Sequence, residues 1–171
     1  MSSQTRSFSR TLPPPAECLA LVIATLELVP FGLAGLQNPV FFADGYGLPI
    51  SNPQNASRSP PTPTPTTRST TTPKAEQEKE QEQRTKKALV AAIAARNVQN
   101  GVLLLAFGLV LRDRRALGVA VLAGLVATLA DTLIVKAYGV RDRIAGHYVG
   151  VLNSLLVGGS LLYWGRNDPL W

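Results

Sequence analysis

The chain contains one cysteine and one histidine among its 171 residues. With Cys18 alone, an internal disulfide and any cysteine-based zinc site are excluded. One histidine leaves no helix with paired metal ligands at i and i+4, so we expect no metal ion. A Gly-rich phosphate loop and the sharp serine turn of the hydrolases are also missing. We therefore expect no cofactor.

Polar and apolar residues are segregated into blocks, and this segregation changes what the net charge of +6 means. In a soluble protein such a charge would suggest nucleic acid as a partner. Here the basic residues mostly flank apolar runs, as at Arg84, Lys86, Lys87, Arg112, Arg114 and Arg115. Anchoring at the membrane edge explains them better, and no nucleic-acid binding is expected.

Four apolar runs are long enough, or nearly so, to cross a bilayer, which takes about 20 residues of helix. They cover residues 18–36, 88–111, 117–135 and 145–164. The connections between the last three runs are short, and short links join antiparallel neighbours. The sequence therefore predicts an all-α integral membrane protein, an antiparallel four-helix transmembrane bundle whose partner is the lipid bilayer.

The chain divides into four parts around one domain. We expect a polar arm over residues 1–15, the first transmembrane helix and an interfacial loop over 16–49, a linker over 50–87, and three further helices over 88–171. The linker begins with a Ser/Thr/Pro-rich stretch that cannot bury enough apolar surface to fold, so it should be disordered. It ends in an alternately charged, solvated helical run that leads into the second span.

Residues 38–49 hold two prolines, two glycines and three aromatics. This composition argues against a regular helix and predicts an apolar loop at the interface or across the mouth of the bundle. Further on, Asn55-Ala56-Ser57 is a glycosylation sequon. Its use would make Asn55 a glycosylation site, put the long loop in the lumen, and favour an endomembrane such as the endoplasmic reticulum.

Small residues recur at intervals of four on two spans, where they would let helices approach closely. The fourth run carries Gly146, Gly150, Ser154 and Gly158, and the third carries Ala116, Ala120, Gly124 and Thr128. Residues at i and i+4 share one helix face. Each row is therefore predicted to be a packing ridge that faces the interior of the bundle.

Each apolar run also holds one ionisable residue: Glu27, Arg96, Asp131 and His147. Such a residue costs about 2.5–3.5 kcal/mol at the bilayer centre on insertion scales, so it is rare unless paired, hydrated or functional. At about 1.5 Å per residue, the first three lie about 12–13 Å from the mouth and His147 lies nearer to it. All four are thus expected in one half of the bundle.

A buried arginine needs an anion, because its side chain stays charged. Glu27 lies at the same depth as Arg96, and Asp131 is the alternative partner. Asn97 and Asn100 extend the polar patch around Arg96. His147, with an ordinary pKa near neutrality, is the natural proton carrier. The alternative interpretation is a structural network that matters only for folding.

Several of these features together resemble one family. They are Ala95-Arg96-Asn97 at the start of the polar second span, the segment 42–49, Asp131 late in the third span and His147 early in the fourth. This pattern is similar to the small four-span membrane family catalogued as domain of unknown function 4267. The resemblance implies an integral membrane protein, often encoded in fungi beside natural-product biosynthesis genes, with no general activity established.

The residues and the resemblance lead to one functional expectation with an alternative. The expected function is cofactor-free acid–base chemistry, as in an isomerase, cyclase or dehydratase, on a lipophilic small molecule of polyketide or terpenoid type. The alternative is a non-catalytic scaffold for other pathway enzymes, or a transport accessory. The sequence leaves open whether the protein is an enzyme. The candidate catalytic residues are His147, Asp131, Arg96, Asn97, Asn100 and Glu27.

Overall fold

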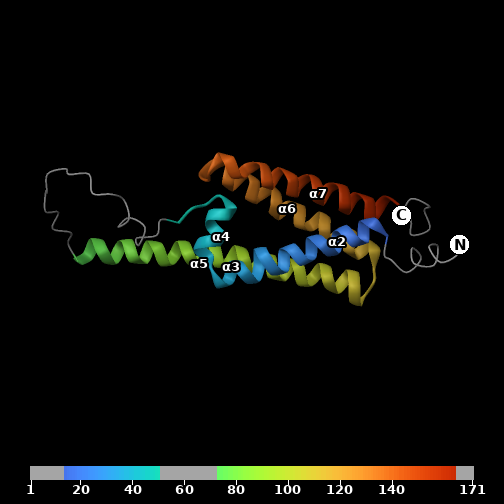
Figure 1. Ribbon diagram of the computed structural model, residues 1–171, viewed down its shortest axis with the longest axis horizontal. Helices are drawn as coiled ribbons and strands as arrows, with labels where there is room; N and C mark the ends of the chain where they lie inside the picture. Colours follow the sequence, from blue (N-terminus) through green and yellow to red (C-terminus); the bar gives the residue numbers. More distant parts are fainter. Residues whose placement is uncertain (1–13, 51–72, 165–171) are drawn as a thin grey trace, which may run out of the picture.

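The computed structural model describes residues 14–50 and 73–164, and within these ranges every regular element is a helix. Four helical stretches are long and apolar enough to cross a membrane: Pro15–Gln37, Gln77–Val110, Arg114–Tyr138 and Arg141–Tyr163. They confirm the four predicted spans and lie side by side as an elongated bundle (Figure 1). The predictions for the polar arm, the Ser/Thr/Pro-rich stretch and Asn55 concern residues that lie largely or wholly outside the described ranges.

The first span runs from Pro15 to Gln37 as three consecutive helical segments. These are α2 (Pro15–Leu26), the π-helical segment η1 (Glu27–Leu33) and α3 (Ala34–Gln37). Pro30 lies inside η1 and has no N–H to give to the preceding turn, so the backbone widens locally. The neighbouring helix supplies a donor in this segment, because the Asn97 amide donates to the Phe31 carbonyl at 3.4 Å.

The prediction of an irregular loop over 38–49 was wrong, because Pro39–Tyr46 forms a helix, α4. The side chain of Asn38 caps its start by accepting the Phe41 N–H at 3.1 Å. Pro39 occupies the first turn, where its missing N–H does no harm. Gly47 ends the helix with φ of 94°, a conformation that glycine adopts without strain. Proline and glycine thus mark the ends of the helix.

The helix α4 lies across the mouth of the bundle, which agrees with the predicted location of this segment (Figure 1). The Gly47 carbonyl accepts a hydrogen bond from the Val140 N–H at 2.9 Å. Phe42 and Ala43 pack against Val90 and Ala94 in a small core at this end. The segment between the first and second spans is therefore tied both to the second span and to the turn that joins the last two spans.

The helix α5 (Pro73–Leu105) is continuous from the charged run into the second span, and a π-helical segment, η3 (Ala106–Val110), completes it. Its first turns project beyond the bundle (Figure 1). Along this projection Glu80 pairs with Arg84 at 2.8 Å and Glu82 pairs with Lys86 at 2.6 Å. These i, i+4 pairs support a solvent-exposed helix, as the charge pattern predicts.

The helix α6 (Arg114–Tyr138) and the helix α7 (Ile144–Tyr163) form the second hairpin, linked by the short 3-10 turn η4 (Arg141–Arg143). A Cβ added at Gly118 would meet Leu161 at 3.0 Å, and one added at Gly150 would meet Thr128 at 3.2 Å. Residue numbers rise on one helix as they fall on the other, so the two helices are antiparallel.

The predicted small-residue ridges are only partly used for packing between α6 and α7. Gly150 and Gly158 do face α6, but Gly146 has open space around it. On α6, Gly124 faces Asn100 of α5, so it does not pack on α7. The two faces of α6 therefore contact different helices.

The bundle consists of two tightly packed hairpins. The first span and α5 form the first hairpin, which is packed closely along its length, and the second hairpin is packed as closely. Contacts between the hairpins are far sparser. A core of small and branched side chains joins them away from the mouth: Ala16, Ala20, Ala24, Leu104, Leu117, Ala120, Val121, Val157 and Leu161.

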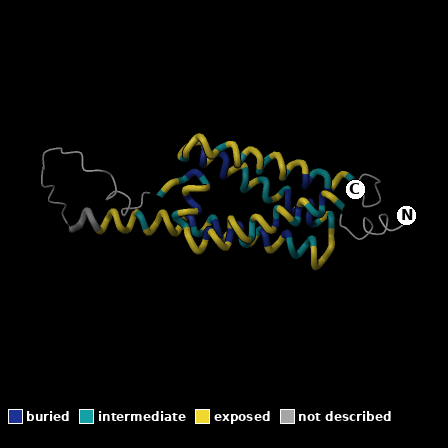
Figure 2. The backbone as a smooth tube through the Cα atoms, in the orientation of Figure 1, coloured by how far each residue is buried: buried dark blue, intermediate teal, exposed yellow. Residues whose placement is uncertain are grey.

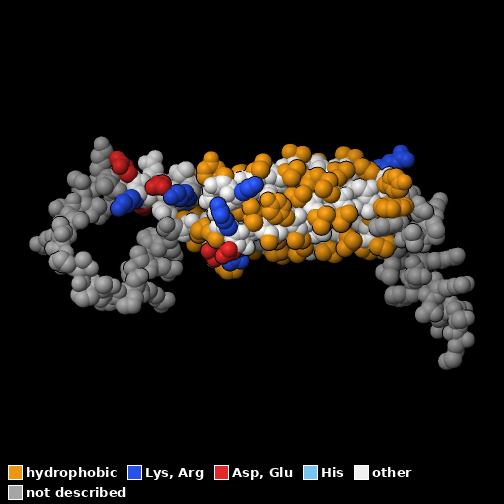
Figure 3. Space-filling model, turned by 90° about the horizontal axis from the view of Figure 1, so that it is seen from above, with side chains coloured by type: hydrophobic (Ala, Val, Ile, Leu, Met, Phe, Trp, Pro, Cys, Tyr) orange, Lys and Arg blue, Asp and Glu red, His pale blue; other side chains and the backbone are white. Residues whose placement is uncertain are grey.

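Buried residues follow the lines where the helices meet, and the outward faces are exposed (Figure 2). These outward faces are apolar: large hydrophobic side chains such as Val126 and Leu133 are 70% and 65% exposed. In the space-filling view apolar side chains cover much of the face shown, and the charged side chains gather toward the ends of the bundle (Figure 3). A lipid environment accounts for this distribution.

Gly101 of α5 allows the closest approach within the first hairpin. A Cβ there would lie 2.7 Å from the Leu28 nitrogen and 2.8 Å from the Ala24 oxygen, both rigid backbone atoms. Gly101→Ala should therefore lower the free energy of unfolding by about 1–3 kcal/mol. Gly159→Ala is the matched control, because nothing lies within 4 Å of its Cβ position. Thermal unfolding in detergent compares the two, and equal midpoints would contradict the close packing.

Candidate functional site

Arg96 of α5 and Asp131 of α6 form a two-pronged ion pair across the hairpins. Arg96 Nη1 donates to Asp131 Oδ1 at 3.1 Å, and Nη2 donates to Oδ2 at 2.5 Å. The side chain of Asp131 is only 11% exposed and that of Arg96 is 39% exposed. The planar guanidinium matches the carboxylate, which makes this geometry strong and specific.

Helix phase selects Asp131 as the partner of Arg96. Thr132 and Val135, close to Asp131 along α6, are buried, so Asp131 is on the inward side of the helix. The sequence placed Glu27 and Arg96 at equal depth and favoured their pairing, and that preference was wrong. Depth fixes the position of a residue along the bundle axis, whereas pairing also depends on the direction in which the side chain points.

Glu27 instead lies beside Asn100, close enough for their side chains to interact, and it also lies within the electrostatic reach of Arg96 and Asp131. Asn100 fits at this place because α6 has Gly124 opposite it: a Cβ there would lie 3.2 Å from the Asn100 amide nitrogen. Glu27 starts the π-helical segment of the first span. The Glu27–Asn100 contact therefore belongs to the first hairpin, and it packs against the second.

Asn97 was expected to extend the polar patch around Arg96, but its hydrogen bond is with the backbone of the first span. It is 8% exposed, and its amide donates to the Phe31 carbonyl in the π-helical segment. The Asn97 amide thus satisfies a backbone carbonyl next to Pro30. The structure places Asn97 beside the polar cluster, with a role in holding the first span to α5.

Tyr46, the last residue of α4, is a member of the cluster that the sequence reasoning did not single out. Its hydroxyl is buried and has no partner in hydrogen-bonding geometry, although it is close enough to Asp131 and Arg96 to interact with both. Burial raises the pKa of Tyr46 above its usual range. The hydroxyl therefore keeps its proton at neutral pH and is a donor whose present geometry completes no hydrogen bond.

A signal for Tyr46 was present in the sequence. It is the one hydroxyl-bearing aromatic in the segment predicted to fold across the mouth. Its ring packs against Phe42 with centroids 5.3 Å apart and meets the His147 ring edge-on at 4.8 Å. These two contacts fix the direction of the hydroxyl.

His147 contacts the backbone of α4. Its Nε2 lies 3.1 Å from the Tyr46 carbonyl oxygen. A carbonyl oxygen only accepts, so Nε2 carries the hydrogen and donates. His147 therefore ties α7 to α4 and holds Tyr46 in place. The proton-carrying role expected for His147 stays a prediction.

The six residues singled out from the sequence thus come together in one half of the bundle, beneath α4. Four of them lie in the two pairs just described, Asn97 lies beside them on the backbone of the first span, and His147 joins them through Tyr46. Within residues 14–50 and 73–164, no three histidine, cysteine or acidic side chains are grouped as metal ligands would be. The arrangement offers one carboxylate held by arginine and one free hydroxyl donor.

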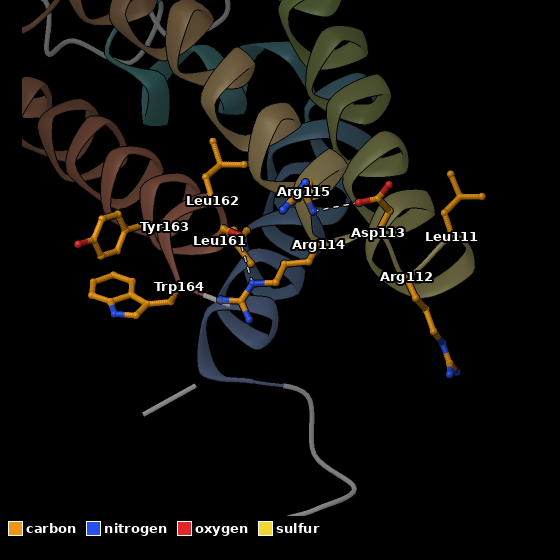
Figure 4. A pocket seen from close by; sticks show the side chains of 9 residues that line it. All are labelled: Leu111, Arg112, Asp113, Arg114, Arg115, Leu161, Leu162, Tyr163 and Trp164. Atoms are coloured by element: carbon orange, nitrogen blue, oxygen red, sulfur yellow. Dashed lines mark hydrogen bonds between the residues drawn. The ribbon is translucent and has the colours of Figure 1, made fainter. Parts of the chain in front are cut away.

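A second ion pair joins the hairpins at the opposite end of the bundle. Arg114 of α6 lies 4.0 Å from Glu17 of α2, and the two side chains are 9% and 13% exposed. From the sequence, Arg114 was expected to anchor the protein at the edge of the membrane, and Glu17 was not a candidate residue. A cavity of about 480 Å³ lies beside Arg114 (Figure 4).

Comparison with known proteins identifies one family. The family described as Domain of unknown function (DUF4267) matches residues 25–161, which is well over half of the chain. This match includes the whole mouth cluster and the second hairpin. No curated protein and no solved structure matches the chain.

Removing one partner of the Arg96–Asp131 pair would leave the other as an uncompensated charge. Arg96→Leu and Asp131→Leu should each destabilise the protein by about 3 kcal/mol, the lower end of the range for buried pairs because Arg96 is partly exposed. The double variant should recover a large part of the loss. Abundance in membranes and thermal unfolding in detergent measure this cycle.

Lys136→Leu is the control, because Lys136 is an exposed charge on α6. We expect little change in this variant. Losses that simply add in the Arg96→Leu/Asp131→Leu double variant would show that the two side chains are not coupled.

Proposed function

The chain belongs to the DUF4267 family, and we propose that this multi-pass membrane protein performs acid–base chemistry on a lipophilic small molecule. One observation carries the proposal: the buried Tyr46 hydroxyl has no hydrogen-bond partner beside the Arg96–Asp131 pair. An unsatisfied buried polar group costs about 1–3 kcal/mol, so it persists where something else uses it. An oxygen atom of a bound substrate would satisfy it.

The proposed chemistry is proton transfer next to a carbonyl group. Asp131 takes a proton from the carbon beside the carbonyl, and the electron pair moves onto the carbonyl oxygen as an enolate. Tyr46 and Arg96 donate hydrogen bonds to that oxygen. The proton then returns at a different atom, which gives an isomerisation or, with loss of hydroxide as water, a dehydration. No redox partner is required.

The other residues of the cluster have supporting roles in this proposal. His147 holds the Tyr46 backbone through Nε2, and its other ring nitrogen is the proposed route by which the proton returns. Glu27 is a second carboxylate within electrostatic reach of Arg96, and Asn100 holds Glu27 in place. Asn97 holds the first span in register beside them.

The substrate class follows from the surroundings of the cluster. Large apolar side chains cover the outward faces of the bundle, which suits a polyketide or terpenoid dissolved in lipid. The resemblance to a family associated with fungal natural-product genes supports a place in secondary-metabolite biosynthesis. With the sequon at Asn55 in use, the long loop and the mouth face the lumen of an endomembrane such as the endoplasmic reticulum.

A specific observation also favours the alternative, a non-catalytic scaffold or transport accessory. Arg96 and Asp131 satisfy each other, and His147 and Asn97 are engaged with backbone carbonyls. A network used in this way stabilises the bundle whether or not a substrate binds. The two functions differ in what Tyr46 contributes, because its hydroxyl makes no hydrogen bond that folding could need.

Metabolite profiling of the native host separates the two functions. The gene is deleted and then restored as wild type, Tyr46→Phe, His147→Ala or Tyr148→Phe. Deletion should accumulate a precursor, and Tyr46→Phe should clear it about 10²–10³-fold more slowly, as for other lost oxyanion donors. Tyr148→Phe is the matched control, since Tyr148 is 51% exposed on α7.

Membrane abundance is measured for each variant alongside the metabolites. A stable Tyr46→Phe protein that restores the product as fast as wild type would rule out the oxyanion role. Full restoration by His147→Ala as well would move the scaffold or transport role ahead of catalysis.

A further inference from the structure

The end of the bundle opposite α4 carries a basic cavity. It lies between the α5–α6 turn and the last turn of α7, and its volume is about 480 Å³ (Figure 4). Three arginines and a single aspartate supply its charged side chains. Its lining consists of Leu111, Arg112, Asp113, Arg114, Arg115, Leu161, Leu162, Tyr163 and Trp164.

Arg114 is the buried member of this group. Its Nε donates to the Leu161 carbonyl at 3.2 Å and its Nη2 to the Ser160 carbonyl at 3.4 Å, so it caps the end of α7. Its Nη1 is buried and has no hydrogen-bond partner, and the nearest Glu17 oxygen lies 4.0 Å away. One face of a guanidinium that is 9% exposed therefore lacks an acceptor.

The single acid of the cavity is already engaged. Asp113 accepts hydrogen bonds from the Arg115 N–H at 2.9 Å and from the Ala116 N–H at 3.0 Å, so it caps the start of α6. Its carboxylate is held by the backbone, and it forms no ion pair with the arginines among the described residues. With Glu17 counted beside Arg114, three arginines face two acids, so the site keeps an excess of positive charge.

Arg112 adds a backbone feature to the same site. It has φ of 49°, and it is the one non-glycine residue with positive φ in the part of the chain that the structure describes. Such conformations carry a cost and occur preferentially at functional sites. The turn directs its exposed side chain outward from the cavity rim (Figure 4).

The cavity lies where spans end, at the depth of lipid headgroups. Tyr163 and Trp164 meet edge-on with ring centroids 5.1 Å apart, and Tyr163 is 82% exposed. Tyrosine and tryptophan concentrate at the membrane–water interface. A ligand in this cavity would therefore have its anionic group among the arginines and its apolar part along the bundle.

We propose that this cavity binds a phosphate group, with the Arg114 fork as the buried anchor and Arg112 and Arg115 at the rim. Arginine guanidinium groups bind phosphate oxygens bidentately, and a phosphate would give Nη1 of Arg114 the acceptor it lacks. The phosphate belongs to a lipid headgroup or to a small soluble phosphate. The site is separate from the mouth cluster and does not depend on the function proposed for it.

Binding of phosphatidic acid to the purified full chain tests the site. The lipid is titrated into protein held in phosphatidylcholine nanodiscs, and affinity is read by native mass spectrometry and thermal stabilisation. The Arg112→Gln/Arg115→Gln variant should bind phosphatidic acid about tenfold more weakly than wild type. The Arg141→Gln/Arg143→Gln variant is the matched control, since it loses the same charge at the other face.

A second titration with inorganic phosphate identifies the source of the group. Competition by millimolar phosphate supports a site for free phosphate, and its absence supports a lipid headgroup. Equal losses in the two double variants would overturn the proposal, since only bulk charge would then matter. So would a wild-type protein that phosphatidic acid and phosphate stabilise no more than phosphatidylcholine does. Should the first double variant not fold, Arg112→Gln and Arg115→Gln are tested singly, because each changes only an exposed side chain, and unchanged affinity in both would overturn the proposal.

Discussion

A charge inside a bilayer must find an opposite charge, and in this bundle the opposite charge lies on the other hairpin. Within each hairpin, glycines and small apolar residues bring the helices close together. Between the hairpins, contacts are sparse, and they include an ion pair at each end: Arg96–Asp131 at the mouth and Arg114–Glu17 at the far end. The relative position of the two hairpins therefore depends on electrostatics as well as on the shared apolar core.

The division of the bundle into two hairpins explains how the residues at the mouth are arranged. The helix α4 belongs in sequence to the first hairpin, yet it reaches the second through the Gly47–Val140 and Tyr46–His147 hydrogen bonds. The Tyr46 hydroxyl is then placed over the one ion pair that joins the hairpins there. A site built at such a junction draws residues from both hairpins, and a change in either one alters it.

The sequence predicted the features that depend on composition along the chain. Apolar runs and short links were enough for four spans and an antiparallel bundle, and helical rise was enough to place four ionisable residues in one half. The sequence did not predict the direction in which each side chain points around its helix. Equal depth therefore suggested Glu27 as the partner of Arg96. The sequence also failed at α4, where proline and glycine mark helix ends, and at Tyr46 and Glu17, whose partners come from distant segments.

The distribution of charges between the hairpins also bears on how the protein enters the membrane during synthesis. Glu27 and Arg96 reside in the same hairpin, so the first pair of spans holds an acid and a base at the mouth end when it leaves the translocation machinery. Asp131, by contrast, arrives with α6 and meets its arginine only when the second pair of spans docks. Docking of the two hairpins is therefore the step that forms both buried ion pairs, Arg96 with Asp131 and Arg114 with Glu17.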